Sequence, residues 1–143
     1  MNSQDVSKAL KKEIFPFLRK KGFAQFTTRT AWKNDEHVIS VINFASLGSY
    51  LGDRYGILSR LTSHSFWIEA GLYFKAMHET PWAKSPAPNL PKVWECQARK
   101  TLKKSLRQFW CRRPDVWYVS TKGTGLDAII TDAKIAVQKQ ASK

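Results

Sequence analysis

This sequence has few of the residues from which metal sites and redox centres are built. It contains two cysteines and three histidines in 143 residues. Cys96 and Cys111 are fifteen positions apart, and neither belongs to the paired C-x-x-C unit that zinc and redox sites use. The histidines are scattered as well. We therefore expect free, reduced thiols, no metal site and no bound cofactor.

Long apolar runs are missing too. No segment approaches the roughly 20 apolar residues that a membrane helix needs, and residues 1–12 are polar and lack the apolar stretch of a signal peptide. We expect a soluble, cytoplasmic protein with no membrane partner. Hydrophobic residues still make up 43% of the chain and aromatic residues 13%, which is typical of an ordered fold. The length fits a single domain over 1–143.

Catalytic motifs do not stand out. The serine-nucleophile pattern G-x-S-x-G and the P-loop ending are both absent. Asp115, Asp132 and Lys134 resemble the paired acids and lysine of metal-dependent nucleases. However, Asp132 and Lys134 fall within a predicted helix and would point in different directions. We expect no catalytic residue, and an enzyme is the least favoured class of function.

Acidic residues are scarce compared with basic ones. Asp and Glu number 11 against 24 Lys and Arg, which gives a formal net charge of +13. Residues 92–113 hold eight of the basic residues and a single acid, Glu95. Such a local excess of positive charge favours an anionic partner.

The spacing of apolar residues predicts most elements of the fold. Steps of three and four predict a helix over 3–21 that kinks or breaks near Phe15, because Pro16 lacks the N–H that would bond Lys12, and that ends at Gly22. Alternation predicts a hairpin with strands at 28–32 and 38–44, then a strand at 65–74 that is central or covered on both faces. A short strand at 116–119 and a helix at 126–137 follow.

The basic segment also has a helical pattern. Its apolar residues (Trp94, Ala98, Leu102, Leu106 and Phe109) fall within one half of a helical wheel, and the cations lie largely on the other half. This predicts an amphipathic helix from Lys92 or Val93 to Trp110. The predicted class is therefore α+β: an antiparallel sheet of three to five strands with helices packed on one face, in the order helix-strand-strand-strand-helix-strand-helix.

The candidate anion-binding residues come from two segments. They are Arg99, Lys100, Lys103, Lys104, Arg107, Arg112 and Arg113 in the basic segment, and Arg54 and Arg60 in the loop 46–64. Cations that neutralise phosphates release condensed counterions and give a sequence-independent affinity for nucleic acid. The alternative is a basic face that is merely solvated. Trp94, Trp110 and Trp117 are expected in the core, although exposed ones would stack on unpaired bases.

Several short phrases are similar to those of one bacterial family. They are Phe17-Leu18-Arg19-Lys20-Lys21-Gly22-Phe23, Thr30-Ala31-Trp32, Val41-Ile42-Asn43-Phe44, Phe66-Trp67-Ile68-Glu69-Ala70-Gly71-Leu72, and Cys96-Gln97-Ala98-Arg99 with the region of Trp117. Over about residues 6–137 the chain resembles the domain of unknown function 4304 family. The resemblance implies one intact domain and transfers no catalytic residue to this chain. Ala45 stands where such proteins often carry a glutamine, and the loop 46–64 is longer and more basic.

These observations predict a small, non-catalytic bacterial binding domain whose basic helix contacts an anionic macromolecule. Nucleic acid is the first candidate for that partner. The alternative is an interaction or immunity-type protein that neutralises an acidic protein, since concentrated charge gives specificity and fast association there as well.

Overall fold

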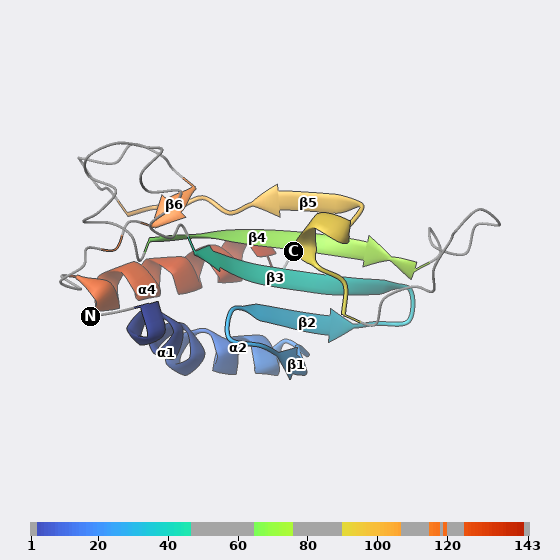
Figure 1. Ribbon diagram of the computed structural model, residues 1–143, viewed down its shortest axis with the longest axis horizontal. Helices are drawn as coiled ribbons and strands as arrows, with labels where there is room; N and C mark the ends of the chain where they lie inside the picture. Colours follow the sequence, from blue (N-terminus) through green and yellow to red (C-terminus); the bar gives the residue numbers. More distant parts are fainter. Residues whose placement is uncertain are drawn as a thin grey trace.

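A six-stranded antiparallel sheet organises the chain, and α1, α2 and α4 lie along one of its faces (Figure 1). The computed structural model describes residues 3–46, 65–75, 90–106, 115–117, 119 and 125–141. The helical elements are α1 (Ser3–Glu13), α2 (Phe15–Lys20), the 3-10 turn η3 (Val93–Glu95), α4 (Leu126–Ala136) and the π turn η4 (Val137–Ala141). The strands are β1 (Gln25–Phe26), β2 (Thr30–Asn34), β3 (Val38–Ser46), β4 (Phe66–Phe74), β5 (Ala98–Thr101) and β6 (Val116–Trp117). The predicted α+β class is confirmed, with one strand more than the predicted upper limit.

Strand β4 is the central strand of this sheet. One of its edges pairs with β3 along the full nine residues, from Val38↔Phe74 to Ser46↔Phe66. Its other edge is shared, because Glu69–Leu72 pair with β5 and Phe66–Trp67 pair with β6. The predictions of the hairpin, the central strand, the short strand near 116 and the final helix are confirmed.

The N-terminal helix breaks where the proline predicts. Helix α1 ends at Glu13, Ile14 is a turn residue, and α2 begins with Pro16 in its first turn. Gly22 then adopts φ +101°, and its N–H bonds the carbonyl of Arg19 at 3.1 Å. The N–H of Phe23 bonds the carbonyl of Leu18 at 3.0 Å, which completes a Schellman closure. The chain thereby turns back so that Phe23 joins the core.

The two faces of the sheet are covered differently. On the helix face, side chains such as Leu10, Leu18 and Ile130 pack against Ile42 and Ile68 in the larger hydrophobic core. On the opposite face, which we call the η3 face, a smaller cluster joins strand residues to the segment around η3 (Trp32, Ile39, Val41, Tyr73, Val93 and Cys96). The indole N–H of Trp32 donates to the carbonyl of Pro91 at 2.8 Å and anchors that segment.

The predicted basic helix over 92–110 is wrong in its described part. Only Val93–Glu95 form a helical turn, and Ala98–Thr101 form β5. Cys96 is extended, with φ −73° and ψ 141°, so the chain leaves the turn as a strand. The physical reason is the free edge of β4, whose N–H and C=O groups need partners, and β5 supplies them. Residues 107–110 lie outside the described residues.

A close approach at Gly71 holds this segment against the sheet. A Cβ atom placed on Gly71 would lie 2.7 Å from Sγ and 3.0 Å from Cβ of Cys96. Only glycine leaves room for Cys96 to pack directly on the backbone of β4. The buried Cys96 side chain therefore fixes where β5 starts.

Gly71→Ala is expected to lower the free energy of unfolding by about 1–3 kcal/mol, because the added methyl overpacks the contact with Cys96. Chemical denaturation of Gly71→Ala, Cys96→Ala and the double variant measures this. The cost of Gly71→Ala should shrink clearly in the Cys96→Ala background, where the sulfur is gone. An equal cost in both backgrounds would show that the approach to Cys96 is not the constraint.

Candidate functional site

Four of the nine predicted anion-binding residues lie in the described part of the chain. Arg99, Lys100 and Lys103 are exposed and Lys104 is half-buried. They lie on β5 and its extended continuation, at the outer edge of the sheet. The other five fall outside the described residues, namely Arg107, Arg112, Arg113, Arg54 and Arg60. The described cations therefore share an edge strand rather than one side of a helix.

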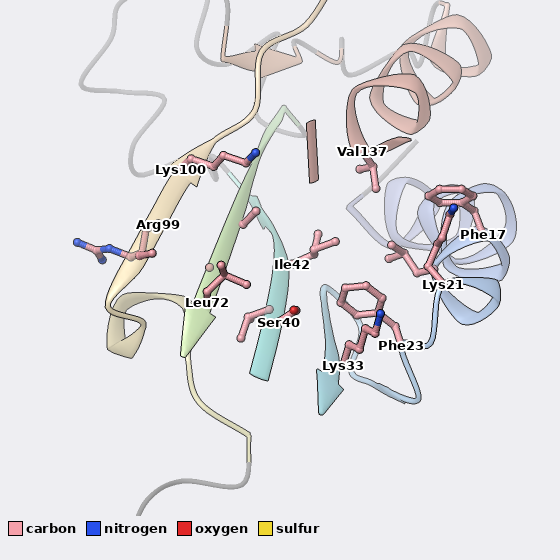
Figure 2. A pocket seen from close by; sticks show the side chains of 15 residues that line it. Phe17, Lys21, Phe23, Lys33, Ser40, Ile42, Leu72, Arg99, Lys100 and Val137 are labelled. Atoms are coloured by element: carbon pink, nitrogen blue, oxygen red, sulfur yellow. The ribbon is translucent and has the colours of Figure 1, made fainter. Parts of the chain in front are cut away.

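A strand distributes these cations differently from a helix, because successive side chains point to opposite faces. Arg99 is paired with Gly71 and Lys100 with Ala70. Figure 2 shows Lys100 on the helix face and Arg99 extending the other way. The prediction of a single cationic helix face is thus corrected: positive charge lies on both sides of one sheet edge.

The turn η4 is hydrogen-bonded to β5 and to the residues that follow it. The carbonyl of Gln140 accepts a hydrogen bond from the ammonium of Lys100. The side-chain amide of Gln140 bonds the backbone of Lys103 in both directions, accepting from its N–H at 2.9 Å and donating to its carbonyl at 2.7 Å. The backbone at 100–103 is thereby fixed, while the ammonium of Lys103 remains exposed. Lys139, also exposed, adds a cation next to Gln140.

The two described tryptophans of the basic region behave in opposite ways. Trp117 is fully buried and stacks on Phe66, with ring centroids 5.7 Å apart and planes 8° from parallel. The core prediction is right for Trp117, which has no face left for a base. Trp94 is 66% exposed, so the core prediction is wrong there. Trp110 lies outside the described residues.

Asp132 has a structural role. Its Oδ2 accepts a hydrogen bond from the indole N–H of Trp117 at 3.0 Å and another from the backbone N–H of Ser105 at 3.1 Å. Asp132 and Lys134 both lie in α4, the element that the sequence predicted for them. One carboxylate thus connects α4, β6 and the continuation of β5.

The thiol of Cys96 is held in its neutral form. Burial raises its pKa, the nearby carboxylate of Glu95 raises it further, and Arg99 acts in the opposite direction with a smaller effect. A thiol with a raised pKa has little thiolate at neutral pH, so it is a weak nucleophile. Cys96 is a packing residue, consistent with its contact at Gly71.

A pocket of about 430 Å³ opens on the helix face, between α2, η4 and the sheet (Figure 2). Lys21, Lys33, Lys100 and Arg99 line it together with Ser40 and apolar residues, and none of its described lining residues is acidic. Sequence reasoning missed Lys21 and Lys33. A signal for Lys33 was present, because alternation along β2 places it on the same side as the buried Ala31.

Comparisons with protein-family models, with curated proteins and with solved structures give no match to this chain. The resemblance to the domain of unknown function 4304 family therefore stays a prediction. Among the described residues, no three His, Cys, Asp or Glu side chains are grouped as metal ligands would be. None of the described helices has the length and apolar character that crossing a membrane requires.

Asp132→Ala is expected to lower the free energy of unfolding by about 1–3 kcal/mol, because the buried indole N–H of Trp117 would lose its acceptor. Asp132→Asn retains an acceptor oxygen and should lose clearly less. Asp127→Ala, an exposed site in the first turn of the same helix, is the matched control, with an expected loss of about 0.3–1 kcal/mol from the helix dipole. Equal losses for Asp132→Ala and Asp127→Ala in thermal or denaturant unfolding would contradict the bonding assigned to Asp132.

Proposed function

We propose that this chain is a non-catalytic binding domain that contacts nucleic acid through the edge surface formed by Arg99, Lys100, Lys103 and Lys139. One observation carries the proposal: three exposed cations lie within five consecutive residues, 99–103, which begin in the outermost strand β5 and continue just past its end. None of those three is ion-paired with a carboxylate in the part of the chain that the structure describes. Their charge is therefore available to phosphates.

Charged side chains on an edge strand have another explanation. Lysine and arginine on β5 would hinder pairing of this edge with the edge of a second molecule. That need is met by a few charges, and a net charge of magnitude about 2–8 is enough to keep a small domain soluble. A net charge of +13 exceeds both requirements. The excess supports a polyanionic partner.

The surroundings of the edge surface favour single strands over duplex. Trp94 lies in η3 and Arg99 is paired with Gly71, which contacts Cys96 just after η3, so an exposed indole and a guanidinium share the η3 face. Exposed aromatic rings stack on unpaired bases and contribute about 1–3 kcal/mol per base, while neighbouring cations contact the backbone. The proposed ligand is therefore single-stranded nucleic acid crossing the edge of the sheet.

The double variant Arg99→Ala/Lys103→Ala is expected to weaken binding to a homopolymeric single strand and to flatten its salt dependence. Each lost phosphate contact should reduce the slope of log K against log salt by about 0.7, so the pair should reduce it by about 1.4. Fluorescence anisotropy over a salt series measures both quantities. Lys11→Ala/Lys12→Ala removes the same charge from the exposed end of α1 and is the matched control.

A slope that falls equally in the test pair and in the control pair would contradict the edge surface as the binding site. No retention of polynucleotide by the native chain, together with co-purification of one acidic protein at moderate salt, would contradict the proposal and favour the neutralisation of an acidic protein.

Trp94→Ala should weaken binding to single strands more than binding to duplex of the same length.

A further inference from the structure

The pocket on the helix face has the form of a small-molecule site. Its volume of about 430 Å³ lies within the range of about 300–1,000 Å³ that is typical of ligand pockets. The floor is the sheet, where Ser40 and Leu72 lie side by side on β3 and β4, and Ile42 and Ala70 form the next row. Phe17 and Phe23 form the wall on the α2 side, and Val137 of η4 lies near Phe17 (Figure 2).

Leu72 shows that the described part of the chain leaves this floor partly uncovered. It lies on the strand that is paired on both edges, yet its side chain is 40% exposed. An exposed leucine in the middle of a sheet is apolar surface that a ligand would remove from water, which is favourable by roughly 25 cal/mol per Å². The floor therefore favours an apolar ligand body.

Three lysines surround this apolar floor, one just after α2, one on β2 and one on β5, and each is held by a different contact. The ammonium of Lys21 lies 5.7 Å from the centroid of the Phe17 ring. The stem of Lys33 passes over Gly22, where a Cβ atom would lie 3.0 Å from its Cε. Lys100 is anchored by its bond to the carbonyl of Gln140. Side chains that are already positioned lose less conformational freedom when a ligand binds.

The charge around the pocket is uneven. Lys21 immediately precedes Gly22 and the stem of Lys33 lies over it, whereas Lys100 lies on β5, three strand spacings or about 14 Å from β2. One of the three N–H donors of the Lys100 ammonium is already used in the hydrogen bond to the carbonyl of Gln140. Arg99 also lines the pocket, but its side chain extends away from it (Figure 2). With no acidic residue among the described lining residues, the α2–β2 side is the most favourable position for an anionic group.

We propose that this pocket binds an amphipathic organic anion, an apolar chain that ends in a single carboxylate. The carboxylate lies beside Lys21 and Lys33, and the chain lies over Leu72 and Ile42. This site shares Lys100 with the edge surface, but its anion-binding end at Lys21 and Lys33 lies outside that surface. The inference does not depend on the binding of nucleic acid.

The test titrates the full chain with octanoate, decanoate and dodecanoate, and with decanol as the uncharged analogue of decanoate. Isothermal calorimetry at fixed pH and salt gives the dissociation constants. Lys33→Glu is the test variant, with Lys21→Ala as a second variant at the same end. Lys8→Glu is the matched control, because it changes the charge on an exposed position of α1, which does not line the pocket.

We expect saturable one-to-one binding of at least one carboxylate. Decanol should bind about tenfold or more weakly than decanoate, the effect of one lost charge-assisted hydrogen bond. Lys33→Glu should weaken binding at least as much, Lys21→Ala should weaken it in the same direction, and Lys8→Glu should change it less than about twofold. Leu72→Gln should weaken binding of the carboxylate ligands, because it removes apolar surface from the floor of the pocket. It should leave the affinity for single-stranded nucleic acid unchanged, because it alters no charge.

Three results would overturn the inference: no saturable binding of any of the three carboxylates, equal affinity for decanol and decanoate, or equal effects of Lys33→Glu and Lys8→Glu. Circular dichroism of each variant identifies any that fails to fold. In that case Lys21→Ala decides the outcome, because its ammonium is exposed and its loss removes no buried contact.

Discussion

Hydrogen bonding along both edges of β4 is the constraint on which the rest of the structure depends. One edge pairs with β3 and the other with β5 and β6, so segments drawn from residues 38–117 meet on one strand. Gly71 lets Cys96 pack directly on the strand, which fixes where β5 begins. Arg99 and Lys100 therefore point to opposite faces. The edge surface and one side of the pocket both follow from that pairing.

The sequence predicted the elements whose signals are local. Pro16 and Gly22 each act through their own backbone geometry, one by lacking an N–H and the other by tolerating a positive φ, so the break and end of the first helix were predictable. The hairpin and α4 follow from apolar periodicity. The prediction of a helix in the basic segment failed because the backbone groups at the free edge of β4 require hydrogen-bond partners, and this segment supplies them as a strand. The local periodicity of apolar residues carries no information on which segment pairs with β4.

The candidate sites show the same division. The excess of positive charge in the composition predicted an anionic partner, and Arg99 and Lys103 are exposed, as binding to such a partner requires. The grouping of Lys21, Lys33 and Lys100 around one pocket arises from strand order and from the turn at Gly22. These three lysines lie far apart in the sequence, and no spacing rule connects them. Trp94 and Trp117 differ in exposure for the same reason, since only tertiary contacts decide which ring is covered.

The central claim is that the cationic segment after Cys96 is an edge strand paired with β4. Nuclear Overhauser contacts in solution test it most directly. The account predicts cross-strand contacts between Leu72 and Ala98 and between Glu69 and Thr101, together with the strong sequential Hα–HN contacts of extended chain over 98–101. Helical Hα–HN contacts between residues three apart across the same segment, with none to β4, would contradict it.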